Sequence, residues 1–301
     1  MKLDDGVVVV TGAGSGIGRA TALAFAKQGN RVAICDVDEA RLAALAGELG
    51  DRVLLSRKVD VADRAQMAAF ADAVHQHVPA VDVVVNNAGV AVGGTFLEIS
   101  LDDWDWIVGI NLKGVVHGCH FFVPKMVERK RGQVINISSI LGIYPAPSVT
   151  AYVATKFAVL GMSQSLRAEL AQHHVGVTAI CPGLINTQIV ADGRVRGMAG
   201  ERREKVKATF RKGASPEIVA ADPILLDPGV AHLVAVVDRR RAPDGEQDGV
   251  CVPQVPRVAD LAGDPRHVVI AHKCLRHKGI QKLAVSTQGV RQLEEVAARQ
   301  A

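Results

Sequence analysis

The feature that most constrains the fold is a glycine-rich turn placed between a strand and a helix. A β-branched run at residues 7–10 leads into it, and an Ala-rich helical pattern at residues 19–28 follows at once. Glycines let the backbone approach a pyrophosphate closely, and the first turn of a helix offers free N–H groups to phosphate oxygens. The pattern therefore predicts a dinucleotide-phosphate site made of Gly12, Ser15, Gly16, Ile17 and Gly18.

Strand and helix patterns alternate from residue 7 to residue 181. Apolar runs predict strands at residues 7–10, 31–35, 53–59, 81–85, 133–137 and 175–180, and residues 102–130 form one long helix or two in sequence. Such alternation is typical of a Rossmann-type, doubly wound parallel sheet with helices on both faces, a three-layer αβα arrangement. In these folds the ligand lies at the carboxyl ends of the strands.

An acidic residue ends the second predicted strand. Asp36 lies near the position where a carboxylate accepts hydrogen bonds from the adenosine ribose and repels a 2′-phosphate. Neither Ser15 nor Val37 supplies a cation to reverse this preference, so NAD is expected rather than NADP. The alternative role, a helix N-cap, suits Asp38 better. At the end of the third strand, Asp60 is placed to bond the adenine edge.

Tyr152 and Lys156 lie four residues apart at the start of a predicted helix and so share one face. Bringing a tyrosine pKa from about 10 to about 7 requires roughly 4 kcal/mol of phenolate stabilisation. One cation about 4 Å away supplies about that much at an effective dielectric near 20. The pair alone also arises by chance on solvated helices. Its significance comes from Ser139, which precedes it at a strand end.

Composition restricts the class of protein. The chain has 301 residues, a formal net charge of +4 and 4% aromatic residues, whereas a nucleic-acid binder would show denser basic clusters with aromatic residues between them. The amino terminus carries neither a basic region nor a long apolar run, so no secretion signal or membrane span is predicted. Five scattered cysteines without a Cys-x2-Cys pair favour reduced thiols and a cytoplasmic location over disulfides or zinc.

The carboxyl-terminal third has a different character. Residues 184–213 are polar enough to form a flap over a substrate, and beyond residue 215 Pro and Arg interrupt the pattern repeatedly. We therefore divide the chain into a catalytic domain at 1–215 and an irregular extension at 216–301, with a short strand at 268–270 and a helix at 292–299. A divergent extension, a partly disordered tail and an altered reading frame all fit this pattern. No metal site is expected, and the histidines at 267, 272 and 277 are interpreted as solvated.

Several motifs together resemble the short-chain dehydrogenase/reductase family. They occur in the family's order and close to its spacing over residues 5–215: Thr11-Gly12-x3-Gly16-x-Gly18, Asn86-Asn87-Ala88-Gly89, Asn111, Ser139, Tyr152-x3-Lys156 and Pro182-Gly183. After residue 215 the chain departs from the family, because we find no counterpart of the Gly-rich last strand.

The resemblance implies a role for each matching residue. Tyr152 is expected to be the general acid/base, Ser139 to hold the same substrate oxygen, and Lys156 to lower the tyrosine pKa and bind the nicotinamide ribose. Asn111 is expected to anchor a water in a proton relay. The remaining cofactor contacts implied by the resemblance are Asp36, Asp60, Val61, Asn87, Ala88, Gly89, Pro182, Gly183, Ile185 and Thr187.

Two functions are consistent with these residues. The first is an NAD-dependent oxidoreductase that interconverts a secondary alcohol and a ketone, with a small-molecule substrate held by residues 93–96, 141–146 and 184–211. The second is a non-catalytic NAD-binding sensor or scaffold on the same fold. Small residues at Ala154, Ala158 and Gly161 favour close helix packing, either in a homodimer or homotetramer, which we expect, or against the chain's own sheet.

Overall fold

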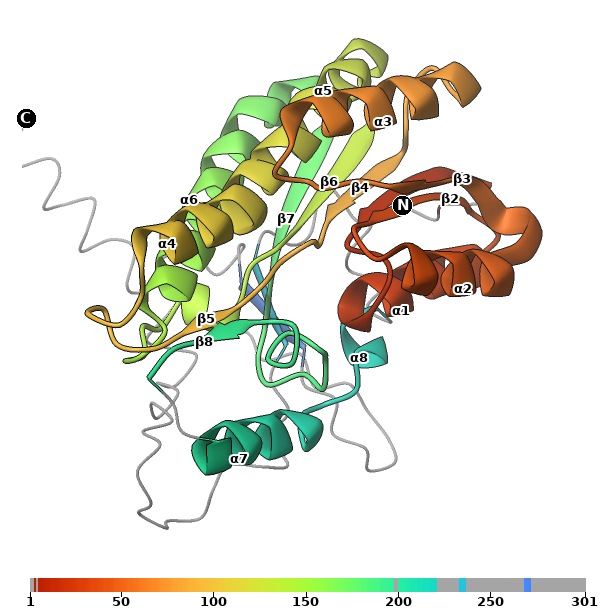
Figure 1. Cartoon of the computed structure of the whole chain (residues 1–301). Coiled ribbons are helices and arrows are strands. Elements are labelled where there is room, and N and C mark those ends of the chain that lie inside the picture. Colours follow the sequence, from red (N-terminus) through yellow and green to blue (C-terminus); the bar gives the residue numbers. More distant parts are fainter. Residues whose placement is uncertain (1–2, 4, 198–199, 221–232, 237–267, 272–301) are drawn as a thin grey trace, which may run out of the picture.

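The computed structural model describes residue 3 and residues 5–197, 200–220, 233–236 and 268–271 (Figure 1). Its main feature is an eight-stranded sheet of order β10-β9-β7-β6-β4-β1-β2-β3, in which every neighbouring pair is parallel. The strands are β1 Val7–Thr11, β2 Arg31–Asp36, β3 Val53–Lys58, β4 Val83–Asn86, β6 Gly132–Ile137, β7 Val175–Pro182, β9 Leu233–Val236 and β10 Val268–Ala271. The predicted doubly wound parallel sheet is confirmed.

Strand β1 shows how the sequence builds the two sides of this sheet. Val8 and Val10 pack into the apolar cluster on one face, while Val7 and Val9 pack into the cluster on the other. All four are buried because successive side chains of a strand point to opposite faces and both faces are covered.

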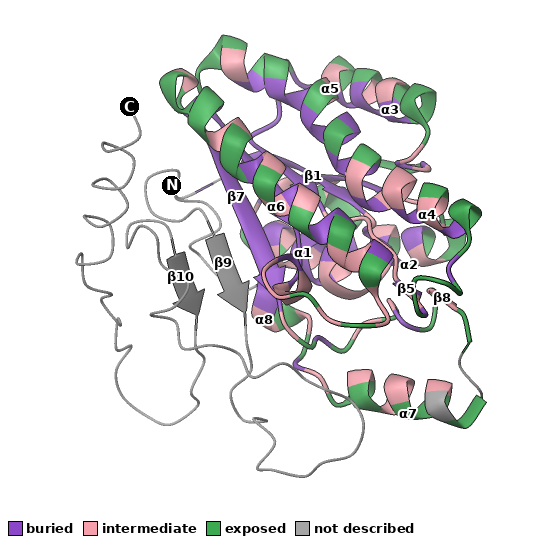
Figure 2. Ribbon diagram, turned by 90° about the vertical axis from the view of Figure 1, so that its left-hand side faces the viewer, coloured by how far each residue is buried: buried purple, intermediate pink, exposed green. Residues whose placement is uncertain are grey.

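Helices cover both faces and complete the three predicted layers (Figures 1 and 2). Helices α1 (Gly16–Lys27), α2 (Glu39–Leu49) and α8 (Glu217–Ala220) contribute to one cluster. Helices α3 (Arg64–His77), α5 (Gly114–Arg129) and α6 (Thr150–Leu170) contribute to the other. Short 3-10 turns lie at Gly50–Arg52, Ile140–Gly142 and Ala171–His173.

Local hydrogen bonds fix where the helices begin. Asp38 caps α2 by accepting from Arg41 N, as the sequence predicted, and Asp63 caps α3. Ser100 and Asp103 form a capping box at the start of α4 (Leu101–Val108).

The predicted helix at residues 102–130 consists of three consecutive helical segments. A π-helical turn at Gly109–Lys113 joins α4 to α5, and Pro124 lies inside α5. In the described part of the chain, Leu101–Arg129 is the one helical stretch with the length and apolar composition to cross a membrane. Over half of its most apolar window is buried within the fold.

Two strands from the carboxyl-terminal third extend the sheet. The strand expected at 268–270 is present as β10, whereas β9, which pairs with β7, was not expected. Helix α8, just beyond residue 215, packs into the core through Val219. The proposed division at 215 stays a prediction, and the expected helix at 292–299 lies outside the described residues.

Candidate active site

The glycine loop between β1 and α1 has the backbone that its sequence predicted. Gly12 and Gly16 have φ values of 62° and 52°, and a Cβ on Gly12 would lie 2.7 Å from Ala88 Cα. Ser15 at the start of α1 makes no side-chain capping bond, unlike the caps of α2, α3 and α4. The first-turn N–H groups of α1, including that of Ile17, therefore lack the usual side-chain acceptor, as an anion-binding helix end requires.

The strand end at Asn87 holds this loop in place. Its side-chain Nδ2 donates to Thr11 O at 3.0 Å and to Gly12 O at 2.9 Å, while Thr11 Oγ1 accepts from the backbone N–H groups of Asn87 and Ala88. A Cβ on Gly18 would overlap Gly12 O and Asn87 Nδ2. The glycine loop and the Asn86–Gly89 segment thus form one hydrogen-bonded unit. Within this unit, position 18 has space for a glycine but not for a larger residue.

Asp36 lies at the end of β2 beside the glycine loop, as predicted. Its Oδ2 accepts from Gly14 N at 2.8 Å and its Oδ1 from Asp38 N at 2.9 Å, so the carboxylate is fixed in direction and each oxygen keeps acceptor capacity. Val59 N donates to Asp36 O, and this bond brings the following residue, Asp60, to the same edge of the sheet.

Asp60 and Val61 have clear local roles. Asp60 Oδ1 accepts from Ala62 N at 2.9 Å, and buried Val61 packs so closely on Gly114 that a Cβ there would lie 2.7 Å from Val61 Cγ2. His117 Nδ1 contacts Val61 O at 2.8 Å, which gives this histidine a packing role. Within the described residues, no three His, Cys, Asp or Glu side chains are grouped to hold a metal ion.

Tyr152 and Lys156 share one face of α6, and Lys156 Nζ lies 5.7 Å from the centroid of the Tyr152 ring. Burial raises the pKa of Tyr152 to about 12, although hydrogen bonding with the Ser139 side chain acts to lower it and Cys181 acts to raise it. This direction is opposite to the one expected from the Tyr-x3-Lys spacing, because loss of hydration disfavours the phenolate more than its neighbours favour it.

Lys156 is buried, and its ammonium donates to Ile137 O at 2.9 Å. Burial lowers the pKa of Lys156 to about 8, while Cys181 acts to raise it. The end of β6 also carries Ser138, whose hydroxyl donates to Lys156 O at 2.8 Å. Ser138 therefore bonds to the backbone of α6, whereas the Ser139 side chain hydrogen-bonds with Tyr152.

Asn111 is fully buried in the π-helical turn. Its Nδ2 donates to Val90 O at 2.9 Å and Thr155 Oγ1 at 3.2 Å, and its Oδ1 accepts from Val90 N at 2.8 Å. A Cβ on Gly89 would lie 3.5 Å from both Asn111 Oδ1 and Lys156 Nζ. The structure thus brings Gly89, Asn111 and Lys156 together, and Asn111 Oδ1 keeps one acceptor position.

Of the predicted residues at and after the end of β7, Thr187 lies beside the glycine loop. Pro182 ends β7 and is buried, Gly183 follows it, and buried Ile185 forms a β-bridge with Ala214. A Cβ on Gly16 would lie 3.0 Å from Thr187 Cγ2. These contacts put the segment that begins at Ile185 beside the phosphate end of the loop.

Two groups of charged residues near this site were missed from the sequence. Buried Asp103 pairs with Arg194 and Arg196 at 3.2 and 2.7 Å, and these hydrogen bonds hold the pKa of Asp103 below its usual range. Arg41 pairs with Asp192 at 2.7 Å. The capping pattern around Asp103 is visible in the sequence, whereas the partners of both pairs lie too far along the chain for a local pattern to reveal them.

Fold and site together define a doubly wound α/β protein of the Rossmann type with a tyrosine–lysine centre beside its glycine loop. Residues 6–195 match the family described as short chain dehydrogenase. The chain belongs to this family of oxidoreductases.

Curated relatives agree with this assignment. The chain is 38% identical over 240 residues to the probable oxidoreductase EphD of Mycobacterium tuberculosis, a match that covers 79% of this chain and 40% of that relative's length. It is 38% identical over 192 residues to the 3-oxoacyl-[acyl-carrier-protein] reductase FabG of Thermotoga maritima, which covers 62% of this chain and 77% of the reductase.

Solved structures show the same fold. A short chain dehydrogenase/reductase from Burkholderia phymatum in complex with NAD is 33% identical with a TM-score of 0.69, covering 73% of this chain and 85% of that one. The closed form of serine dehydrogenase complexed with NADP+ is 30% identical with a TM-score of 0.71, covering 81% and 99%.

Proposed function

We propose that this protein interconverts a secondary alcohol and a ketone by hydride transfer with NAD, and that Tyr152 is its general acid/base. The observation that carries the proposal is the convergence of the tyrosine–lysine pair with Asn111, Gly89 and Ser139 beside the glycine loop. The three polar partners of Tyr152 at this centre, Lys156, Asn111 and Ser139, are all buried. Such buried polar groups with shifted pKa values are typical of catalytic centres.

A nicotinamide dinucleotide fits the residues around the loop. Gly12, Gly16 and Gly18 leave no space for side chains where the backbone must approach a diphosphate, and α1 presents uncapped N–H groups there. Relatives of this fold are complexed with NAD or NADP+. When bound, the nicotinamide supplies the hydride acceptor for oxidation or, in its reduced form, the donor for reduction.

Asp36 supports NAD over NADP. Two backbone N–H groups orient its carboxylate, which would accept ribose hydroxyls and repel a 2′-phosphate. Arg41 also lies close to this carboxylate, since Asp36 Oδ2 and Arg41 Cβ would both contact a Cβ on Gly14, but its guanidinium is bonded to Asp38 and Asp192. It is therefore engaged elsewhere rather than free for a phosphate.

The chain's own groups handle the proton. In ketone reduction, the neutral Tyr152 phenol donates its proton to the substrate oxygen, and Ser139 binds the same oxygen. The raised pKa of Tyr152 is compatible with this step because it keeps the phenol protonated. In alcohol oxidation, the phenolate accepts the hydroxyl proton. Lys156, mainly protonated at neutral pH with its pKa of about 8, then stabilises the negative charge on Tyr152.

Asn111 and the segment after β7 complete the proposed site. Asn111 Oδ1 has one free acceptor position for a water that connects Lys156 to solvent. Asp60, Val61 and residues 87–89 would contact the adenosine side, and residues 182–187 the carboxamide side.

We further propose a homodimer or homotetramer in a reducing, cytoplasmic environment. Val116 on α5 and Phe157 on α6 are large apolar side chains with exposed surface, as an oligomer contact on these helices would use. Cys35, Cys119 and Cys181 are free thiols.

The proposed activity is tested with a panel of secondary alcohols of graded size, each mixed with the protein and NAD. Appearance of the reduced-nicotinamide absorbance with at least one alcohol supports an oxidoreductase. NADH binding without turnover of any alcohol, or of the matching ketones with NADH, would instead favour the sensor or scaffold function.

A further inference from the structure

The segment after β7, from Thr187 to Gly193, passes beside the glycine loop. At its beginning the Thr187 methyl group packs near Gly16, and at its end Gly193 fits so tightly that a Cβ would lie 2.8 Å from Ala91 O. Between these two points runs the covering segment, which we define as residues 187–192. A dinucleotide whose diphosphate lies on the glycine loop is therefore overlaid by the covering segment.

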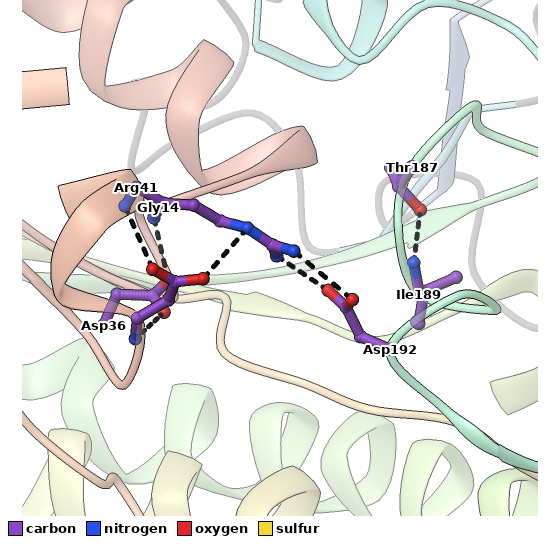
Figure 3. Close-up of polar contacts among 7 residues, drawn as sticks. Gly14, Asp36, Arg41, Thr187, Ile189 and Asp192 are labelled. Atoms are coloured by element: carbon purple, nitrogen blue, oxygen red, sulfur yellow. Dashed lines mark hydrogen bonds and ion pairs between the residues drawn. The ribbon is translucent and has the colours of Figure 1, made fainter. Parts of the chain in front are cut away.

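An exposed ion pair joins the covering segment to α2 through Asp192, the last residue of the segment. Arg41 Nη1 lies 2.7 Å from Asp192 Oδ2, and Arg41 Nη2 lies 3.4 Å from Oδ1, although 151 residues separate the two (Figure 3). Arg41 Nε also contacts the capping Asp38 at 3.1 Å, which holds the guanidinium in this direction. Side-chain exposures of 40% for Arg41 and 44% for Asp192 make the pair accessible to water and salt.

The chain immediately beyond the covering segment is fastened much more firmly. Arg194 and Arg196 both pair with Asp103, whose side chain is 0% exposed, and the Arg194 guanidinium lies 4.0 Å from the centroid of the Trp106 ring. Strand β8 (Arg194–Val195) also pairs with β5 (Val92–Gly93). The segment is thus followed by an anchor of buried charge and backbone pairing, whereas the contact that ties it to α2 is an exposed ion pair.

We propose that the Arg41–Asp192 pair is a latch that holds the covering segment over the bound cofactor and sets the rate at which the cofactor leaves. This proposal rests on the proposed binding of a nicotinamide dinucleotide. Asp103 keeps its partners on opening, so the anchor beyond the segment stays in place while the exposed pair breaks and the buried Val190 moves.

The weak free energy expected of the exposed Arg41–Asp192 pair is suited to a covering segment that closes reversibly. Exposed ion pairs contribute little and are screened by salt, so loss of this one is expected to speed cofactor release about two- to fivefold. A much stronger contact would slow turnover by trapping the product cofactor, since opening of lids limits the rate of many enzymes.

The test is the NADH dissociation rate, measured by stopped-flow fluorescence on displacement of NADH by excess NAD. Asp192→Asn and Arg41→Gln should each raise this rate about two- to fivefold, and the double variant should match either single one, because both remove the same contact. Raising ionic strength should speed release from the wild-type protein more than from Asp192→Asn. Glu48→Gln, which removes a second exposed pair of α2, that with Arg19, is the matched control and should leave the rate unchanged.

Release from Asp192→Asn at the wild-type rate, or additive effects in the double variant, would overturn the latch while leaving cofactor binding intact. A wild-type protein that shows no NADH fluorescence change would instead overturn the cofactor assignment, and the latch with it.

Discussion

Lys156 Nζ lies 5.7 Å from the centroid of the Tyr152 ring while donating its hydrogen bond to Ile137 O rather than to the tyrosine. The ammonium therefore acts on Tyr152 through space, and the strand end at Ile137 fixes its position. This arrangement keeps a positive charge beside the phenol without a direct bond that would have to break when the proton moves. This arrangement also buries the positive charge of Lys156, and burial of that charge affects the stability of the fold.

Burial of Lys156 makes stability depend on pH. Folded Lys156 loses its proton near pH 8, whereas an unfolded lysine keeps it to about pH 10. Between these values the unfolded state binds more protons, so stability rises with pH. From pH 8 to pH 10 the wild-type protein should gain roughly 2 kcal/mol relative to Lys156→Met, measured by urea unfolding. The raised pKa of Tyr152 acts above this window, and parallel curves for the two proteins would refute the prediction.

Asp103 is expected to stabilise the fold above its unfolded pKa of about 4. Because its folded pKa is depressed, this contribution is present at neutral pH and is lost as pH falls through the folded value. Asp103→Asn should lower the free energy of unfolding by about 1–3 kcal/mol at pH 7, and the difference should shrink in acid. Asp105→Asn, at an exposed position of the same helix, is the control. Equal losses in both variants would mean that the two arginine pairs contribute nothing.

Gly18 and Gly47 form a matched pair of helical glycines. A Cβ on Gly18 would overlap Gly12 O and Asn87 Nδ2, while one on Gly47 meets nothing within 4 Å. Gly18→Ala should therefore destabilise by about 1–3 kcal/mol and weaken NADH binding. Gly47→Ala should stabilise by up to about 1 kcal/mol, because alanine favours the helix. Thermal unfolding measures both, and similar changes in the two variants would contradict the packing described for the loop.

The charge on Asp36 should decide between the two nicotinamide cofactors. Asp36→Asn removes the negative charge facing the ribose, so the affinity ratio of NADPH to NADH should rise at least about tenfold, or about 1.4 kcal/mol. Taking the ratio within one variant cancels any general weakening of the loop. Glu39→Gln, which changes an exposed carboxylate in the first turn of α2, three residues further along the chain, should leave the ratio unaltered. Isothermal titration measures both affinities, and a constant ratio in Asp36→Asn would reject the role of Asp36.

Much of the fold could be predicted because its signals are local. The valine run of β1, the glycine loop and the caps Asp38 and Asp63 each lie within a few residues of the structure that they specify. Strand β9 was missed, since its pairing with β7 depends on a strand edge more than 50 residues away in the sequence.

Distance along the chain explains what was missed in the site. The bonds of Asp103 to Arg194 and Arg196 span 91 and 93 residues, and no local pattern encodes them. The direction of the Tyr152 pKa shift was wrong for a related reason. The helical spacing of Tyr152 and Lys156 predicts that a cation lies near the phenol. The burial that raises the pKa of Tyr152 depends instead on packing from several elements, which no local pattern shows.

The most direct test of the central claim is Tyr152→Phe, which removes one hydroxyl and keeps the ring. Turnover of an alcohol that the wild-type protein oxidises should fall by at least about a hundredfold, the usual contribution of a general acid/base, while the dissociation constant for NADH stays within about twofold. Steady-state kinetics and fluorescence titration on the same preparation measure both quantities. Turnover that remains within a few fold of wild type, with NADH still bound, would contradict the assignment of Tyr152 as the acid/base.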